Sequence, residues 1–268
     1  MLSTEYINQQ IKAGYKVHLN KGVWWQKIAP FFYKPVIRLM PIVPGQAYPS
    51  RLKSFLGYSH VVTDKKFANG VWSVMLLSED RLKTYDFKSI SSSKRARVRK
   101  GLKHSEVRRI ENIESVLEEM RDICISTAKR TRHGLPPEYY IKNYEKWCRY
   151  IKKEFSLSNR EWWGVFFQDK LIAYFYAYMI DHTMFIVTAK SHTDFLDKCP
   201  NDCLLFKFLK YCRDLADCRQ VIFGDWAPDT PTLNKFKEKY GFKKVDLPVY
   251  KKYNPIILST KRLLKFKR

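Results

Sequence analysis

Three apolar runs near the middle of the chain constrain its fold more than any other feature. They cover Trp162–Phe167, Leu171–Ile180 and Thr183–Ala189, and short turns around Asp169 and at Asp181-His182 separate them. Runs of this length between tight turns predict buried β-strands joined as antiparallel neighbours. We therefore expect a sheet built around residues 162–189.

Segments on both sides of this sheet alternate between helical and strand patterns. A helix with a serine cap is expected from about Lys94 to Lys103, and Gly241 is a typical helix stop. The expected order is strand 71–77, helix 94–103, strand 107–110, helix 113–129, helix 138–155, the three strands, helix 202–215, strand 221–224, helix 230–240 and strand 242–250. This order predicts an α+β fold (an α/β sandwich) with a mixed, mostly antiparallel sheet flanked by helices.

The first 60 residues are expected to be irregular, because five prolines interrupt an aromatic run that includes Trp24 and Trp25. One interpretation is a strap packed on the main domain. The alternative is a segment at a membrane surface, since Lys27, Lys34 and Arg38 lie among the rings. We expect an N-terminal extension over residues 1–84, a main domain over 85–253 and a basic tail over 254–268.

The net charge of the chain limits the classes of partner that it is expected to bind. There are 50 Lys and Arg against 26 Asp and Glu, a formal charge of +24. This predicts an acidic partner, such as nucleic acid, an anionic membrane face, an acidic carrier protein or a phosphate-bearing substrate. Lys94 and Arg95 lie in the first turn of the basic helix, where the helix dipole disfavours cations, so a bound anion would relieve that penalty. The alternative is a solvated charged face. The sequence does not predict an oligomeric state.

Two further exclusions concern membranes and metals. No apolar run reaches the roughly 20 residues that span a bilayer, and the first ten residues do not resemble a signal peptide. We expect a cytoplasmic protein with free thiols, with contact at the inner membrane face as an open alternative. The Cys199–Cys203 spacing fits zinc, but Cys212 and Cys218 do not form a second pair, so no metal site is expected.

The order of elements resembles the GNAT N-acyltransferase fold, and in particular its FemAB-like and BioF2-like branch. The resemblance covers about residues 85–253. Its motifs are the basic run of Lys94-Arg95, Arg97 and Arg99-Lys100, and later Phe223-Gly224-Asp225, Phe236-Lys237, Tyr240-Gly241-Phe242 and Tyr250.

This resemblance implies transfer of an acyl group to an amine. The donor would be acyl-CoA or an acyl carrier protein, used as a co-substrate with no permanently bound cofactor. In FemAB-like members the donor is aminoacyl-tRNA and the acceptor a cell-wall or lipid amine. The glycine-rich loop of acyl-CoA users is missing, and residues 190–202 stand in its place. The donor-binding candidates are Arg95, Arg99, Lys190, Asn201 and Asp202.

Three residues are catalytic candidates. Asp225 could deprotonate or hold an ammonium group, Lys237 could neutralise an oxyanion or a phosphate, and Tyr250 could act as an acid. Each also has an ordinary structural interpretation, as a turn aspartate, a solvated cation or a core tyrosine.

The acceptor-binding candidates are aromatic. They are Tyr174, Tyr176 and Tyr178, which alternate along one strand face, and Trp226. His133 is a weaker general-base candidate. A hypothesis from another class is a non-catalytic nucleic-acid-binding protein that uses the basic helix and tail.

Overall fold

The three apolar runs form the antiparallel strands that the sequence predicts. They are β7 (Arg160–Phe167), β8 (Lys170–Ile180) and β9 (Thr183–Ser191). Both connecting turns place two residues at positive φ, Gln168-Asp169 and Asp181-His182. Such turns match the twist of the flanking strands, which explains why these connections are short.

The computed structural model describes residues 2–50, 54–131 and 135–254, which form two compact units. Of these residues, unit 1 contains those from 75 to 244, and unit 2 contains those from 2 to 74 and from 245 to 254. Strands β5 (Gly70–Leu77) and β11 (Lys243–Tyr253) contribute residues to both units. The boundaries expected after residues 84 and 253 remain proposals. The basic tail beyond residue 254 and His133 lie outside the described residues.

Unit 1 contains a mixed sheet with helices on both faces. Its strand order is β5-β10-β9-β8-β7-β6; β9 and β10 pair in parallel, whereas β6, β7, β8 and β9 pair antiparallel in turn. Its remaining elements, in chain order, are α2 (Glu79–Lys83), α3 (Ser92–His104), β6 (Glu106–Arg109), η2 (Glu114–Val116), α4 (Leu117–Thr131), α5 (Pro137–Lys142), α6 (Tyr144–Phe155), η3 (Thr193–Lys198), α7 (Pro200–Asp214), β10 (Gln220–Asp225) and α8 (Pro231–Glu238). The α+β class and the mostly antiparallel sheet are confirmed.

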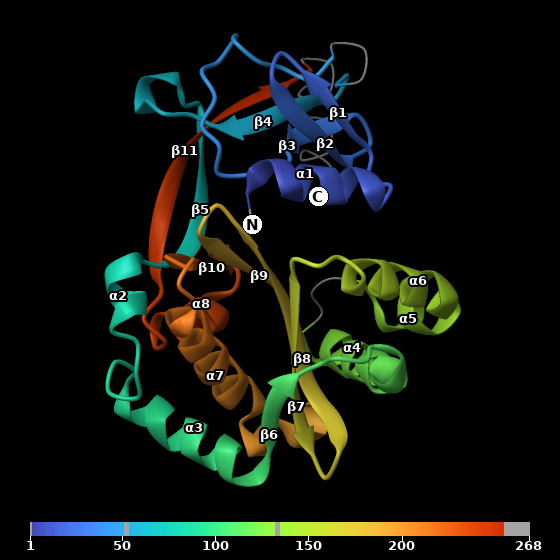
Figure 1. Ribbon diagram of the computed structural model, residues 1–268, viewed down its shortest axis with the longest axis vertical. Coiled ribbons are helices and arrows are strands. Elements are labelled where there is room, and N and C mark those ends of the chain that lie inside the picture. The colour runs from blue at the N-terminus through green and yellow to red at the C-terminus, as the bar shows by residue number, and fades with distance from the viewer. Residues whose placement is uncertain (1, 51–53, 132–134, 255–268) are drawn as a thin grey trace, which may run out of the picture. The chain divides into compact units, whose positions relative to one another are not determined.

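Two hydrophobic cores hold the helices of unit 1 to the sheet. Figure 1 shows α4, α5 and α6 on one side of strands β7 to β9 and α7 on the other side. Phe175 and Phe208 pack in the core under α7, whereas Tyr174, Tyr176 and Trp147 belong to the core under α4 to α6. Alternate residues of β8 therefore face opposite helical layers.

Unit 2 corrects the expectation that residues 1–60 are irregular. This segment forms α1 (Ser3–Lys12), β1 (Val17–Asn20), β2 (Val23–Ala29), β3 (Phe32–Pro35) and β4 (Gly57–Val61), followed by η1 (Lys65–Phe67). The strand order in the unit is β1-β2-β3-β4-β11-β5. Trp25 and Tyr58 pack in its core. The prolines misled the prediction because Pro35 ends a strand and the others lie in connections, where they break no strand.

The helix expected over residues 138–155 is in fact two helices, α5 and α6, with Asn143 between them. The other expected helices and strands are present, with ends that differ by a few residues. Among the residues that the structure describes, no helix has both the length and the apolar character that crossing a bilayer requires.

Candidate active site

A cavity of about 350 Å³ lies between strands β8 and β9 and helices α4, α5 and α6. Lys190 of β9 and Cys124 of α4 line it together with Leu135, Ile151 and Thr188. Its aromatic walls are Tyr139, Tyr140, Trp147, Tyr150, Tyr174 and Tyr176. Tyr174 and Lys190 are direct cross-strand partners, so both side chains leave the sheet on the same face.

Among the described residues that line this cavity, Lys190 is the one with a cationic side chain. Its Nζ donates to the Tyr140 hydroxyl at 2.9 Å and lies 4.8 Å from the centre of that ring. Burial alone would lower the pKa of Lys190, but Cys124 and Tyr140 outweigh burial and raise it. Lys190 therefore stays protonated at neutral pH and offers a positive charge inside a largely apolar space.

Tyr174 and Tyr176, two tyrosines of the cavity, stay neutral at neutral pH. The Tyr174 hydroxyl and Cys124 Sγ lie 3.0 Å apart, and burial raises the pKa of both groups. The Tyr176 hydroxyl lies 3.3 Å from that of Tyr150, and burial raises the pKa of Tyr176 as well. The described lining of the cavity thus offers hydroxyl donors and one ammonium group, a combination that favours an anion or a carbonyl oxygen over an amine.

A second group of candidates lies at the end of β10. Lys237 of α8 is 3% exposed, and its Nζ donates to the backbone carbonyl of Asp225 at 3.0 Å. The same Nζ lies 5.0 Å from the centre of the Phe223 ring. Burial lowers the pKa of Lys237 to about 8, while the charge of Asp225 opposes that shift. Lys237 is therefore poised to give up or take a proton near neutral pH.

Local sequence explains this position of Lys237. Gly224 has φ +61°, and a Cβ added there would lie 3.9 Å from Lys237 Nζ. The buried Asn234 donates to the Ala227 carbonyl at 2.6 Å and so fixes the loop that follows Asp225. The exposed Asp225 carboxylate and the buried Lys237 ammonium thus sit at one strand end.

The cavity with Lys190 and the pair Asp225–Lys237 lie near the point where strands β9 and β10 stop pairing. Strands β9 and β10 pair in parallel only from Thr183–Gln220 to Phe185–Ile222. Thr188 and Lys190 lie further along β9, and Asp225 lies further along β10. The two sets of candidate side chains therefore belong to segments of β9 and β10 that no longer pair with each other.

Comparison with known proteins supports this topology. No family model and no curated protein matches the sequence. The crystal structure of FemX covers 96% of this chain and 93% of its own, with 13% identity and a TM-score of 0.62.

Two further solved structures have the same architecture. The C-terminal domain of a putative lysylphosphatidylglycerol synthetase from Agrobacterium fabrum has 10% identity, covers 92% of this chain and 89% of its own, and gives a TM-score of 0.58. A GCN5-related N-acetyltransferase from Kribbella flavida has 5% identity, covers 91% and 92%, and gives 0.50.

The chain has a GNAT-like fold of the FemX type. The structural resemblance inferred from the sequence motifs is confirmed at the level of the fold. The N-terminus of a helix can hold phosphate groups, because its first backbone N–H groups have no partners within the helix. Helix α7, which follows β9 and η3, offers such an N-terminus.

In this GNAT-like chain the first turn of α7 contains a buried ion cluster of the protein's own side chains. Asp202, in its first turn, is 2% exposed and accepts from Lys94 Nζ at 2.5 Å, from Arg97 Nε at 3.0 Å and from the Tyr240 hydroxyl at 2.9 Å. Pro200 carries no N–H group, and the Asp202 and Cys203 amides donate to the Cys199 carbonyl. Asp202 is thus placed in a buried ion cluster.

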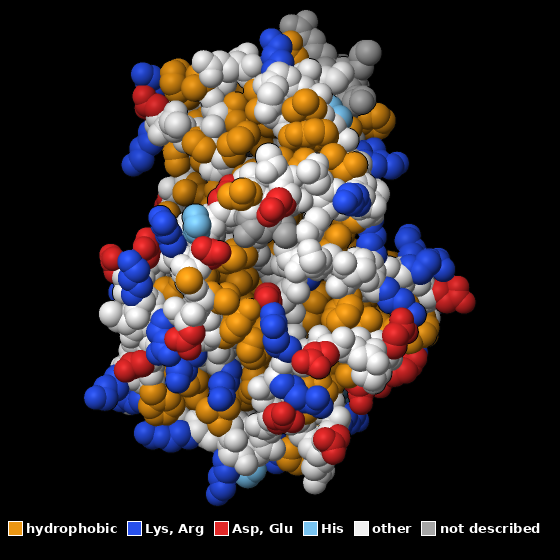
Figure 2. Space-filling model, viewed as in Figure 1, with side chains coloured by type: hydrophobic (Ala, Val, Ile, Leu, Met, Phe, Trp, Pro, Cys, Tyr) orange, Lys and Arg blue, Asp and Glu red, His pale blue; other side chains and the backbone are white. Residues whose placement is uncertain are grey.

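The other donor-binding candidates each have their own contacts. Asn201 donates to Ser191 Oγ at 2.9 Å, Arg95 donates to the Ile90 carbonyl at 2.8 Å, and the Arg99 guanidinium lies 4.7 Å from the centre of the Phe87 ring. Among the donor-binding candidates, only Lys190 lines the cavity between β8, β9 and helices α4 to α6, which we call the tyrosine cavity. The basic face of α3 is exposed at Arg99, Lys100 and Lys103. In Figure 2, Lys and Arg side chains are dense in the lower left, where Figure 1 places α3.

The remaining candidates have separate surroundings. Tyr178 stacks on Phe185 with ring centres 5.1 Å apart, and Lys244 Nζ lies 4.3 Å from the centre of the Trp226 ring. Tyr250 belongs to unit 2, where it packs near Tyr58 and His60.

Sequence reasoning missed Cys124, Tyr140, Trp147 and Tyr150, which complete the cavity wall. Their helical spacing indicates only a buried face. All six cysteines are buried free thiols.

Proposed function

We propose that the protein is a transferase that moves an aminoacyl group from aminoacyl-tRNA to an amine. The observation that supports the choice of donor is the N-terminus of α7, where Pro200 carries no N–H group and Asp202 forms a buried ion cluster with Lys94 and Arg97. A donor held mainly by its pyrophosphate would have to displace a buried ion cluster, which is costly. A donor held by a long polyanion along an exposed basic surface avoids that cost.

The proposed roles follow from the position of each charge. The amine attacks the ester carbonyl carbon, the new C–N bond forms, and the bond to the ribose oxygen breaks. Lys190, protonated in the tyrosine cavity, stabilises the oxyanion that develops on the carbonyl oxygen. Lys237, with a pKa of about 8, donates a proton to the departing ribose oxygen and regains one from the attacking amine through solvent. Asp225 attracts the incoming ammonium.

One name among the structural neighbours agrees with aminoacyl transfer to a lipid, although phosphatidylglycerol offers hydroxyl groups rather than an amine as the acceptor. A lysylphosphatidylglycerol synthetase is by name a protein that attaches lysine to a lipid, and L-PGS from Bacillus licheniformis has the same fold with a TM-score of 0.54 and 10% identity. These likenesses support transfer in general and leave the acceptor to experiment.

The test uses the difference between esters and amides in mild base. The full chain is incubated with tRNA charged with radiolabelled amino acids and with a mixture of amine-bearing lipids and peptides. Label that survives mild base treatment reports amide formation. A parallel arm uses radiolabelled acyl-CoA. We expect base-stable label from charged tRNA only.

Other outcomes have definite meanings. Label from acyl-CoA alone would overturn the proposed donor and favour the thioester alternative. Binding of RNA with no base-stable label from either donor would overturn transfer to an amine. If the acceptors also carry no base-labile label, the result would favour a nucleic-acid-binding protein.

Matched variants test the two lysines. Lys190→Met and Lys237→Met should each lower turnover about 100-fold or more, the usual scale for a lost oxyanion donor or acid. Lys207→Met, exposed on α7, should retain activity. Circular dichroism verifies folding, and unchanged tRNA affinity in the two active-site variants would separate chemistry from binding.

A further inference from the structure

Unit 2 contains a second, smaller cavity of about 110 Å³ with a different chemistry. Lys34, Arg38 and Lys251 line it together with the hydroxyl-bearing Ser59. The other walls are Pro35, His60, Val61, Val71, Trp72 and Val249. Among the described residues that line it, none is an Asp or a Glu. Three cations and no carboxylate make an acceptor-rich anion the matching occupant.

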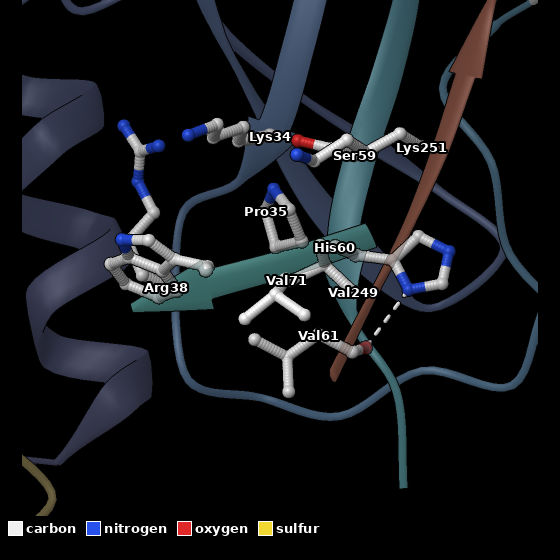
Figure 3. A pocket seen from close by; sticks show the side chains of 10 residues that line it. Lys34, Pro35, Arg38, Ser59, His60, Val61, Val71, Val249 and Lys251 are labelled. Atoms are coloured by element: carbon white, nitrogen blue, oxygen red, sulfur yellow. Dashed lines mark hydrogen bonds between the residues drawn. The ribbon is translucent and has the colours of Figure 1, made fainter. Parts of the chain in front are cut away.

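The sheet itself sets this arrangement. Lys251 of β11 is the direct partner of Ser59 on β4 in the antiparallel register. On the other side, β3 pairs in parallel with β4 as far as Tyr33 and Tyr58, so that Lys34 comes next to Ser59. Adjacent strands therefore place a lysine, a serine and a lysine in one row across the sheet. Figure 3 shows Lys34 and Lys251 on either side of Ser59, with Lys34 directed toward Arg38.

Further contacts fix the two lysines. Asn69 brackets Lys251: its Nδ2 donates to the Lys251 carbonyl at 2.8 Å, and its Oδ1 accepts from the Lys251 N–H at 2.7 Å. The Lys251 side chain runs along Gly70, where an added Cβ would lie 3.1 Å from Cε. Lys34 Nζ lies 5.9 Å from the centre of the Trp72 ring. Strand register thus aligns Lys34, Ser59 and Lys251, and contacts with Asn69, Gly70 and Trp72 hold the two lysines in place. The row is therefore a built feature of the sheet and not a chance group of surface charges.

We propose that this cavity binds the phosphate group of a phosphate ester. A phosphate ester carries up to two negative charges and three acceptor oxygens. These suit the ammonium groups of Lys34 and Lys251 and the Ser59 hydroxyl on three strands, and the Arg38 guanidinium in the turn after β3. A carboxylate has one charge and a planar shape and would leave donors unused. The valines, Pro35 and Trp72 reduce water around the anion and provide an apolar wall for the organic part of the ester.

Two sources of this chemistry exist, a soluble phosphate ester and a phospholipid headgroup. The inference does not depend on the proposed transferase activity, because it concerns binding in unit 2 and is tested without turnover.

The experiment measures binding to the full chain by calorimetry with glycerol 3-phosphate, and by co-sedimentation with vesicles of phosphatidylglycerol. Lys34→Gln and Lys251→Gln remove charge while keeping most of the side-chain length. Lys252→Gln, the exposed neighbour in β11 that lines a different cavity, is the matched control.

Lys34→Gln and Lys251→Gln should each weaken binding about tenfold, whereas Lys252→Gln should change it less than twofold. Loss in the calorimetric arm identifies a soluble ester. A loss confined to vesicles identifies a lipid headgroup. If all three variants weaken binding equally in both arms, or if neither probe binds, the proposal is wrong, and any attraction comes from the general positive charge of the chain. Thermal melting of each variant verifies that unit 2 remains folded.

Discussion

Two buried lysines of unit 1 show how the same side chain takes different roles. Lys94 lies against the Phe236 ring at 4.4 Å, and the buried Asp202 carboxylate balances its charge. Lys237 lies against the Phe223 ring but donates to a backbone carbonyl, and the carboxylate of Asp225 is exposed. A backbone carbonyl balances less charge than a buried carboxylate would, so burial lowers the pKa of Lys237.

The pKa of Lys237 has a consequence for stability. In the unfolded chain a lysine has its ordinary pKa of 10.5, and in the fold the pKa of Lys237 is about 8, so the unfolded state binds more protons between these values. The free energy of unfolding should therefore rise with pH across this window, by at most about 1.4 kcal/mol per pH unit. Lys237→Met should remove this component in urea unfolding series.

The control for that series is Lys235→Met, which is exposed on the same helix and should keep the wild-type pH profile. Equal pH profiles for wild type and Lys237→Met would contradict the lowered pKa.

The Asp202 cluster predicts a large loss of stability. Asp202→Asn leaves the Lys94 ammonium buried without its carboxylate, and breaking a buried pair costs about 3–5 kcal/mol. Asp214→Asn at the other end of α7 removes a solvent-exposed pair with Arg213 and should have no measurable effect. Chemical denaturation of both variants gives the comparison, and similar midpoints for the two would show that the cluster is not structural.

At the scale of elements, the crossing of α3 and α7 explains how the cluster forms. Gly101 of α3 has no side chain, and a Cβ there would lie 2.8 Å from the Cys203 side chain and 3.0 Å from the Cys199 carbonyl oxygen. This close approach lets Arg97 and Lys94, one and two turns earlier, reach Asp202.

Gly101→Ala should therefore destabilise the protein by about 1–3 kcal/mol through overpacking. Helix propensity by itself favours alanine over glycine by about 1 kcal/mol, so a net decrease in stability would isolate the steric effect. Lys103→Ala, exposed on α3, is the control in thermal unfolding. Increased stability of the alanine variant would mean that α3 shifts freely on α7.

Elements were predictable from the sequence wherever local chemistry decides them. The strands over residues 160–191 follow from apolar runs between turns at positive φ, and Gly241, with φ +93°, ends its helix as expected. Strands β1 to β4 were not predicted, because their polar and aromatic residues do not alternate clearly along the sequence. The candidate site was only half predictable: the alternation of Tyr174 and Tyr176 indicated their shared face, but Cys124, Tyr140 and Lys94 meet their partners through contacts distant in sequence.

At the scale of the whole molecule, the charge of +24 predicts how RNA binding depends on salt. Removing one cation that neutralises a phosphate makes the slope of log affinity against log salt shallower by about 0.7–0.9. The triple variant Arg99→Ala, Lys100→Ala, Lys103→Ala should therefore make the slope for tRNA less negative by about 2–3. Filter binding across a salt series measures it.

The control is Lys65→Ala with Lys66→Ala, two exposed lysines of η1 in unit 2, which should leave the slope unchanged. An unchanged slope in the α3 triple variant would mean that RNA does not bind along this helix.

The placement of β11 between β4 and β5 affects how the protein folds during its synthesis on the ribosome. Residues 2–74 leave the ribosome first, yet the strand that sits in the middle of their sheet is made from residues near 245–253, which leave much later. Until β11 has been made, the edges of β4 and β5 that it covers remain unpaired. They are accessible to chaperones and to strands of other nascent chains. Completion of the N-terminal unit therefore comes late in synthesis or after it, whereas residues 75–244 are free to fold before it.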